Sequence, residues 1–388
     1  MDFELTPEQR EIQALARDFA RERIEPHAAE WDREHRFPRE LFGQLAELGL
    51  MGACVPEEYG GAGADFVSYI LVLEELSRAD AGVGVTVAVH TSATTLPILV
   101  FGTDEQKARF VPPLARGEVI GAFALTEPEA GSDAGSLRTR AEPTEDGWTI
   151  TGAKQWITNG RYAGTFLLFA RTDESTDGAR GVSAFILDAD HVRVTRDEEK
   201  LGLNSSATND IVVEGAHVAR DRLLHEENKG FTVAMATLDG GRIGIAAQAL
   251  GIAQAAYDVA RSYAQERHAF GQRIANFQAI QWKLADMSTE IDAARLLVYR
   301  AAWLKATGAP HTEEGAKAKL FASEMARRQT AEAIQILGGY GYTKEFPVER
   351  YYRDAKITEI YEGTSEIQRL VIARQILGRV EHASHAQT

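Results

Sequence analysis

Hydrophobic positions in the first third of the chain recur at helical spacing. Ile12, Leu15 and Phe19 fall on one face of a helix. Thr6 is typical of the residue that caps the N-terminus of such a helix. The same spacing recurs in later segments, so residues 1–120 are expected to form a helical N-terminal domain.

The pattern changes near Gly121 and stays changed as far as Arg220. Short runs of β-branched and aromatic residues alternate with turn signals such as Asp146-Gly147. The region is too short and too rich in strands for units in which strands and helices alternate. We therefore expect residues 121–225 to form a compact β-barrel or β-sandwich domain.

Helical spacing returns in the last part of the chain. Apolar residues from Ile245 to Tyr263 alternate steps of four and three, and a second series does so from Ile280 to Ala301. Such stripes predict an antiparallel four-helix bundle over residues 226–388. Two further helical segments are expected at residues 312–337 and 365–378. The fold class is therefore α+β, mainly helical, in three domains.

The longest apolar stretch covers residues 81–100. Gly84, His90 and Pro97 interrupt it, which argues against a membrane span. The stretch is predicted to be a buried helix and loop.

The composition is that of an ordinary globular protein, with 44% hydrophobic and 26% charged residues over 388 positions. Cys54 is the single cysteine, which excludes an internal disulfide and favours a reducing, cytoplasmic setting. The first residues contain no basic segment followed by an apolar one, so no secretory signal is expected.

Charge and motifs exclude several classes of function. The chain has 42 basic and 57 acidic residues, a formal net charge of −15 and no cluster of lysine and arginine, so nucleic acid is not an expected partner. Motifs of Rossmann dehydrogenases, P-loop enzymes, zinc proteases and serine hydrolases are missing. No metal site is predicted, because no ligand spacing links the scattered histidines His27, His35, His90, His217 and His268.

A carboxylate near the C-terminus has two interpretations. Glu362 lies between Tyr361 and Gly363, just before an amphipathic segment. In the structural interpretation, Ser365 caps a helix together with Gln368, and the nearby acid interacts with the helix dipole. In the functional interpretation, Glu362 is a catalytic base at the edge of a cofactor pocket.

Two polar stretches in the β region are candidates for ligand binding. Residues 123–133 place hydroxyls, acids and glycines where backbone N–H groups would face a ligand. In residues 154–160, Trp156 and Thr158 would share one face of a strand. The indole would then cover a flat heterocycle while the hydroxyl bonds one of its nitrogens. A turn or core role is the alternative for both stretches.

Two features of the helical region are also candidates. The adjacent glycines within residues 335–342 would let the backbone approach a phosphate or a ribityl chain closely, and the alternative is a glycine helix stop. Arg267 is a candidate phosphate clamp, and the alternative is an exposed arginine at a helix end.

Six segments occur in the order and spacing of motifs of the acyl-CoA dehydrogenase family, which the chain therefore resembles over essentially its whole length. These are LTEPEAGSD, KQWITNG, DGGRIGIAAQALGIAQAA, ERHAFGQRI, QILGGYGY and IYEGTSEIQRLVIA. The C-terminal part is most similar to the short-chain (butyryl-type) and short/branched-chain members.

The resemblance implies an N-terminal helical domain, a middle β domain and a C-terminal four-helix bundle, in a homotetramer with one FAD per subunit. It implies an electron-transfer flavoprotein as acceptor and a place in fatty acid β-oxidation or branched-chain amino acid degradation. The flavin contacts that it implies within the subunit are Phe123, Leu125, Thr126, Ser132, Trp156, Ile157, Thr158, Thr364 and Glu366. Those implied from a neighbouring subunit are Arg267, Gln278 and residues 335–339, which include Gln335, Gly338 and Gly339.

The resemblance also implies a reaction. Glu362 would remove the α-proton of an acyl-CoA while the β-hydride passes to flavin N5, giving the trans-2-enoyl-CoA. Desolvation by the bound substrate is expected to raise the pKa of Glu362 above the ~4.3 of free glutamate. In the isovaleryl and long-chain members the base comes from a bundle helix, at the position that Gly241 occupies here. Implied substrate contacts are Ser132, Asp239, Arg242, Gly363 and Arg374.

Two alternatives to the dehydrogenase stay open at this point. One is an acyl-CoA oxidase or flavin monooxygenase on the same fold. The other, from a different class, is a catalytically silent helical scaffold. The length and branching of the acyl group do not follow from the sequence.

Overall fold

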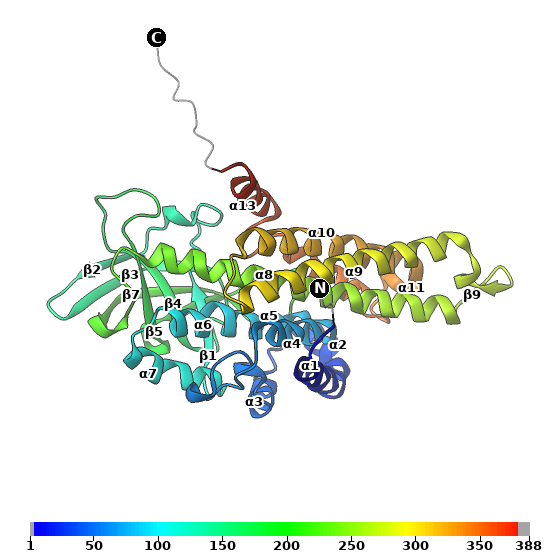
Figure 1. The fold of residues 1–388 in the computed structure, drawn as a ribbon, viewed down its shortest axis with the longest axis horizontal. Coiled ribbons are helices and arrows are strands. Elements are labelled where there is room, and N and C mark those ends of the chain that lie inside the picture. The colour runs from blue at the N-terminus through cyan, green and yellow to red at the C-terminus, as the bar shows by residue number, and fades with distance from the viewer. Residues whose placement is uncertain (1–3, 379–388) are drawn as a thin grey trace, which may run out of the picture.

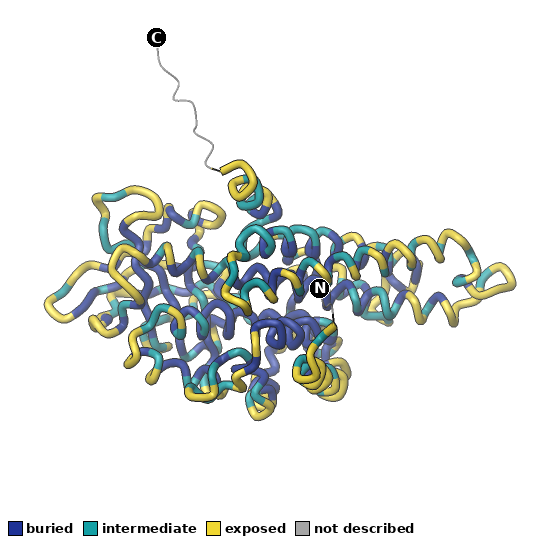
Figure 2. The backbone as a smooth tube through the Cα atoms, in the orientation of Figure 1, coloured by how far each residue is buried: buried dark blue, intermediate teal, exposed yellow. Residues whose placement is uncertain are grey.

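The computed structural model describes residues 4–378 of the 388-residue chain. Figure 1 shows the sheet at one end of an elongated molecule, a long helical bundle at the other end, and the N-terminal helices packed along one side. Buried backbone is concentrated where the sheet and the N-terminal helices meet the bundle (Figure 2).

The N-terminal region is helical, as expected. Thr6 caps its first helix, because the hydroxyl accepts the N–H of Gln9 at 3.2 Å and the Gln9 side chain accepts the N–H of Thr6. The helices are α1 (Pro7–Phe19), α2 (Glu25–Glu34), α3 (Arg39–Glu47), α4 (Phe66–Ala79), α5 (Ala81–Ala88), α6 (Leu96–Phe101) and α7 (Asp104–Ala115).

The apolar stretch contains no loop, so that part of the prediction was wrong. Helix α5, a π-helical segment (Val89–Thr95) and α6 form one continuous helix from Ala81 to Phe101. Within the π-helical segment the hydroxyls of Thr94 and Thr95 bond carbonyls five residues earlier, which sustains the wider turn. Length and composition would suit a membrane span, but 83% of its most apolar window is buried inside the protein. It is therefore a core helix.

The middle region forms one eight-stranded mixed sheet. Along it the strands lie in the order β6, β7, β3, β2, β4, β5, β8, and β1 pairs with β4 in parallel. One face packs against the helices, and the other encloses Trp148 and Phe185, whose ring centres lie 5.3 Å apart. The strands are β1 (Ile120–Ala124), β2 (Arg140–Pro143), β3 (Gly147–Thr158), β4 (Ala163–Arg171), β5 (Val182–Asp188), β6 (Arg193–Asp197), β7 (Thr208–Ala219) and β8 (Leu223–Leu224).

The last region is a helical bundle whose predicted apolar stripes face its interior. Most members of the stripes are buried, and Val259, Tyr263, Ile280 and Leu284 pack against the core partly buried. Its helices are α8 (Gly230–Glu266), α9 (Gln278–Ala306), α10 (Thr312–Leu337), α11 (Gly339–Tyr342), α12 (Val348–Ile357) and α13 (Ser365–Leu377). Strands β9 (His268–Ala269) and β10 (Gln272–Arg273) form a hairpin between α8 and α9, at the end of the bundle farthest from the sheet (Figure 1).

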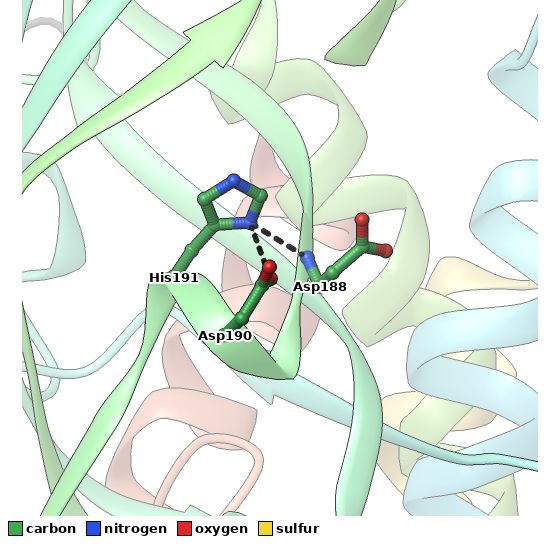
Figure 3. Close-up of side chains that lie close together, drawn as sticks. All are labelled: Asp188, Asp190 and His191. Carbon is green, nitrogen blue, oxygen red and sulfur yellow. Dashed lines mark hydrogen bonds and ion pairs between the residues drawn. The ribbon is translucent and has the colours of Figure 1, made fainter.

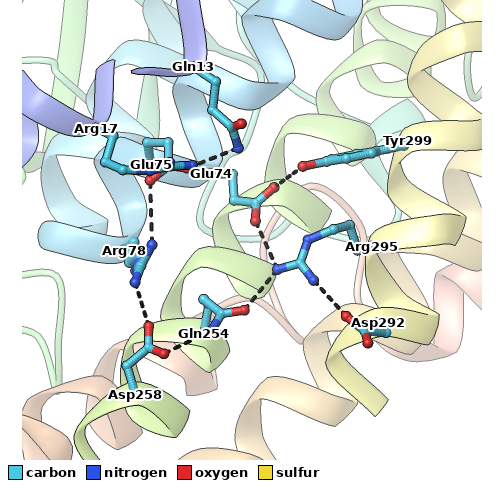
Figure 4. Close-up of polar contacts among 10 residues, drawn as sticks. All are labelled: Gln13, Arg17, Glu74, Glu75, Arg78, Gln254, Asp258, Asp292, Arg295 and Tyr299. Atoms are coloured by element: carbon cyan, nitrogen blue, oxygen red, sulfur yellow. Dashed lines mark hydrogen bonds and ion pairs between the residues drawn. The ribbon is translucent and has the colours of Figure 1, made fainter. Parts of the chain in front are cut away.

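Two adjacent buried carboxylates on α4 tie the N-terminal helices to the bundle (Figure 4). Glu75 pairs with Arg17 of α1 at 2.6 Å. Glu74 accepts hydrogen bonds from Arg295 at 3.2 Å and from the Tyr299 hydroxyl at 2.7 Å, both on α9. Because α4 is held from both sides, it forms a fixed wall beside α8.

Candidate active site

The turn between α12 and α13 presents Glu362 in an unusual backbone conformation. Glu362 has φ 50° and Gly363 has φ 89°, so two consecutive residues are left-handed. This conformation is unfavourable for a residue with a side chain and persists only where the surroundings hold it. Gln368 donates to both of their carbonyls, at 3.2 and 2.8 Å, and Lys319 donates to the Gly363 carbonyl at 2.7 Å. The turn is therefore fixed by side chains from two helices.

The helix cap differs from the one expected. Thr364, not Ser365, is the N-cap of α13, and its hydroxyl accepts the N–H of Ile367 at 3.4 Å. Ser365 is the first helical residue and its buried hydroxyl makes no hydrogen bond within residues 4–378. Gln368 bonds the turn instead of closing a capping box. The left-handed residues reverse the chain early enough for the helix to begin one residue sooner.

Burial of the Glu362 carboxylate is energetically unfavourable. Its Oε2 is buried, and no group in the described part of the chain bonds it. Burial raises the pKa of Glu362 to about 7, although the positive charges of Lys319 and Arg242 oppose that shift. Unpartnered buried oxygens with raised pKa values are typical of functional sites. The carboxylate faces Gly241 of α8 directly.

Helix α8 also brings two predicted substrate contacts together. Arg242 is buried and pairs with Asp239, whose other oxygen accepts the Thr312 hydroxyl at 2.8 Å. The Nε atom of Arg242 is buried and makes no hydrogen bond within the described residues. With Gly241 between them, these side chains lie on the stretch of α8 that meets the Glu362 turn.

The two polar stretches of the β region meet through a buried ion pair. The Lys154 ammonium donates to Glu127 at 2.8 Å and to the Leu125 carbonyl at 3.1 Å. The N–H of Gln155 donates to the Thr126 carbonyl at 2.9 Å. Residues 123–133 and 154–160 therefore form one surface, as a shared binding role requires.

Trp156 departs from regular strand geometry. Trp156 has φ 59°, and the pairing of β3 with β7 shifts register between Lys154 and Ile157. This bulge interrupts the regular alternation at Trp156, and the shared face of Trp156 and Thr158 stays a prediction. The indole is 56% exposed, whereas Ile157 is buried.

Two further predicted flavin contacts lie near this surface with different exposure. Phe123, at the end of β1, packs edge-on against Phe169 at 5.1 Å. Ser132 is exposed in the loop that follows β1.

A second group of predicted cofactor contacts gathers at the far end of the bundle. Arg267, Gly338 and Gly339 line a cavity of about 540 Å³ with Tyr340, whose ring centre lies 5.7 Å from the guanidinium. The hairpin beside Arg267 lies at the opposite end of the molecule from the sheet (Figure 1). One chain therefore does not bring this group together with Thr158. Gln278 and Gln335 are exposed on the same part of the bundle.

The remaining predicted contacts lie on α13. Thr364 and Glu366 line a small cavity of about 170 Å³ beside Lys356 and Glu359. Arg374 is exposed in the last turn of the helix, and within residues 4–378 it forms no ion pair or hydrogen bond.

Asp188, Asp190 and His191 lie close enough together to suggest a metal site (Figure 3). However, Nδ1 of His191 accepts the N–H of Asp188 at 3.1 Å, which is the cap of a short 3₁₀ helix. The Asp188 carboxylate is already paired with Arg222 at 2.5 Å. The cluster is explained by helix capping.

Comparison with known protein families shows the family to which this site belongs. Models of three domains of the acyl-CoA dehydrogenase family match the chain, the N-terminal domain over residues 6–118, the middle domain over 122–216 and the C-terminal domain over 228–377. The chain belongs to the acyl-CoA dehydrogenase family. The resemblance and the fold class inferred from the sequence are thereby confirmed, and the chain is placed among flavin-dependent oxidoreductases.

This acyl-CoA dehydrogenase is similar to a short-chain specific acyl-CoA dehydrogenase of Clostridium acetobutylicum, with 49% identity over 97% of the chain and 100% of the relative. The solved butyryl-CoA dehydrogenase of Megasphaera elsdenii is 47% identical, with a TM-score of 0.96 over 97% of the chain and 100% of that chain. A structure titled for the electron transferring flavoprotein of Acidaminococcus fermentans contains a chain that is 48% identical. Its TM-score is 0.96, over 98% of this chain and 100% of that chain.

The sequence did not reveal two sets of buried charged side chains near the site. Lys319 and the pair of Lys154 with Glu127 are buried beside the predicted site residues. A signal existed for Lys319, which occupies a core position in the helical pattern between Ala316 and Ala322. A charged residue on an apolar stripe marks a buried charge that needs partners.

Proposed function

We propose that this acyl-CoA dehydrogenase converts a short- or branched-chain acyl-CoA to its trans-2-enoyl-CoA, with Glu362 as the base that removes the α-proton. The observation that carries the proposal is the buried, unpartnered Oε2 of Glu362 in a left-handed turn. Gly241 occupies the position from which, by the resemblance, the isovaleryl and long-chain members supply the base, so no carboxylate competes from there.

The raised pKa suits Glu362 to this role. With a pKa of about 7, roughly half of the carboxyl groups are ionised at neutral pH, and the carboxylate is a stronger base than free glutamate. The backbone N–H of Glu362 makes no hydrogen bond within residues 4–378. It is free to donate to the thioester oxygen, where negative charge develops as the α-proton leaves.

FAD is the flavin that we propose, and when bound it would accept the β-hydride. Exposed Trp156 offers an aromatic surface beside Thr158. Beside Gly338 and Gly339, an added Cβ would meet nothing within 4 Å, so backbone is open to a phosphate there. A relative with 28% identity and a TM-score of 0.93 is titled PigA with FAD and proline, which supports the same cofactor here.

The separation of the two groups of flavin contacts supports a homotetramer. Phe123, Leu125, Thr126, Ser132, Trp156, Ile157, Thr158, Thr364 and Glu366 would hold the flavin of their own subunit. Arg267, Gln278, Gln335, Gly338 and Gly339 would reach that of a neighbour. We further propose that Asp239, Arg242, Gly363, Ser132 and Arg374 contact the acyl-CoA, that electrons leave to an electron-transfer flavoprotein and that the setting is cytoplasmic.

The test is anaerobic bleaching of the flavin by a panel of acyl-CoAs: butyryl, isobutyryl, 2-methylbutyryl and longer straight chains. Glu362→Gln is expected to keep flavin and acyl-CoA binding while the reduction rate falls by ~10²–10⁴. Near-normal reduction by this variant would remove Glu362 from the mechanism. A colourless protein would favour a silent scaffold, and rapid peroxide formation in air would favour an oxidase.

A further inference from the structure

Lys319 is a buried ammonium group inside the bundle. It is 0% exposed on α10, among buried alanines that include Ala318 and Ala322. Its Nζ donates to the Gly363 carbonyl at 2.7 Å, and within residues 4–378 it forms no ion pair at contact distance. Burial of an ammonium with one neutral acceptor is strongly unfavourable. Packing alone does not explain a lysine here.

The surroundings of Lys319 link it to the proposed base. Burial lowers the pKa of Lys319 to about 8, and the negative charge of Glu362 is the largest influence opposing that shift. Arg242 lowers it further, whereas Glu359 and Glu366 raise it. The influence is mutual, because the Lys319 charge is also the largest influence that opposes the rise in the pKa of Glu362.

We propose that Lys319 is a positioning residue for proton abstraction: its ammonium fixes the turn that presents Glu362, and its charge increases the ionised fraction of the Glu362 carboxyl. The inference rests on the proposed role of Glu362 and adds a residue that acts through it. Lys319 itself touches the backbone of the turn and takes no proton from the substrate.

The positioning role follows from the hydrogen bonds of the turn. Gln368 and Lys319 approach the Gly363 carbonyl from two different helices, α13 and α10. Gln368 also holds the Glu362 carbonyl. With both carbonyls bonded, the left-handed conformation is fixed and the N–H of Glu362 is left free for the thioester. Loss of the ammonium would remove the hydrogen bond to the Gly363 carbonyl that comes from outside α13.

The electrostatic role follows from the charges that face Glu362. Lys319 on α10 and Arg242 on α8 are the cations that oppose the rise in its pKa. From α4 it faces the buried phenol of Tyr69, and from the turn itself the partly buried phenol of Tyr361. Desolvation raises the pKa values of both, so both are neutral. Removal of the Lys319 charge therefore raises the pKa of Glu362 and lowers its ionised fraction at neutral pH.

The test is the rate of anaerobic flavin reduction by butyryl-CoA between pH 5.5 and 9 in Lys319→Met, with flavin content matched. The pH of half-maximal rate is expected to rise by about one unit, the lower end of the effect of a nearby opposite charge. At pH 6 this corresponds to a roughly tenfold lower rate. The plateau at high pH is also expected to fall, because the turn has lost a restraint.

The matched control is Lys200→Met. Lys200 also donates to a backbone carbonyl, that of Ser206 at 2.8 Å, and burial also lowers its pKa to about 8. It lies in the connection from β6 to β7, where its Coulombic partners are Asp354, Glu198 and Asp197 rather than Glu362. This variant is expected to leave the pH profile unchanged.

An unshifted midpoint in Lys319→Met would overturn the electrostatic role, and an unchanged plateau would overturn the positioning role. The variant Glu362→Gln distinguishes failure of this inference from failure of the proposed function. If Glu362 is not the base, that variant stays active and the proposed function fails. If that variant is inactive, only the role of Lys319 is contradicted. If Lys319→Met does not fold, the wild-type carboxyl of Glu362 and the Cε of Lys319 are titrated by ¹³C NMR. Coupled titration supports the inference, and independent titration overturns it.

Discussion

A Cβ atom on Gly241 of α8 would lie 2.1 Å from Oε2 of Glu362. Real Cβ atoms do not approach an oxygen so closely, so the two side chains compete for one space. Glycine at position 241 is therefore a condition for the observed place of the carboxylate. The resemblance implies that some family members supply the base from this position of α8, and the shared space would allow it.

Gly241→Ala is expected to displace the Glu362 carboxylate and to slow flavin reduction by about a hundredfold, the scale of a misplaced catalytic group. Flavin content should stay normal. The control is Gly240→Ala on the same helix, where an added Cβ meets only the tip of the flexible Lys305 side chain at 2.9 Å. Stopped-flow reduction by butyryl-CoA measures both variants. Equal rates in the two would show that the carboxylate tolerates the methyl group.

Much of the fold was predictable because the apolar stripes and strand runs are local patterns. The site was harder, because its geometry depends on exceptions to those patterns. The left-handed conformation of Trp156 lies at a bulge, and that of Glu362 is held partly by Lys319 on the distant helix α10, so no local pattern encodes either in full. The same holds for Lys319, whose partner lies 44 residues away at Gly363. Resemblance located Glu362, but its surroundings needed the structure.

The pKa of Glu362 has a consequence for stability. A carboxyl with a pKa of about 7 in the folded protein and near 4.5 when unfolded favours folding while it is protonated. Its contribution is complete below about pH 4.5 and is lost as the pH rises through 7. Glu362→Gln does not ionise, so its stability relative to wild type is expected to grow over that window, by at most about 3 kcal/mol.

Thermal melting of the flavin-loaded proteins at pH 5 and pH 8 measures this effect. The variant should melt a few degrees above wild type at pH 8, with a smaller difference at pH 5. Glu118→Gln, which changes a carboxylate with 59% side-chain exposure, is the control and should show no such dependence. A constant difference at both pH values would contradict the raised pKa.

The pair of Lys154 with Glu127 is expected to hold the flavin-binding surface together. Either Lys154→Met or Glu127→Gln leaves a partner buried without its counter-charge, which typically costs about 3–5 kcal/mol. Each single variant should lose flavin and stability, and the double variant should lose less than the sum. Flavin content and denaturant unfolding of the four proteins give the coupling energy. Additive losses would show that the pair does not act as a unit.

Arg267→Ala tests the contact between subunits. If Arg267 reaches the flavin of a neighbour, flavin retention and assembly should weaken together. Arg261→Ala is the control, because Arg261 is also an exposed arginine near the end of α8, and its guanidinium lies 5.6 Å from the Tyr257 ring centre. Light scattering and flavin absorbance measure the two properties on one sample. Loss of flavin from a fully intact oligomer would contradict the placement of Arg267 against a neighbour's cofactor.

The shared space of positions 241 and 362 also permits an exchange of the base. Glu362→Gly alone should abolish flavin reduction, and its glycine suits the left-handed turn better than glutamate does. Adding Gly241→Glu places a carboxylate on α8 facing the vacated space, and the helix tolerates it because glycine is the poorer helix former by up to ~1 kcal/mol. Part of the activity should return, although a misplaced base can cost about a hundredfold. The measurement is anaerobic bleaching by butyryl-CoA at matched flavin content. A double variant that folds and binds substrate, yet reduces no faster than Glu362→Gly, would show that position 241 does not face the α-carbon.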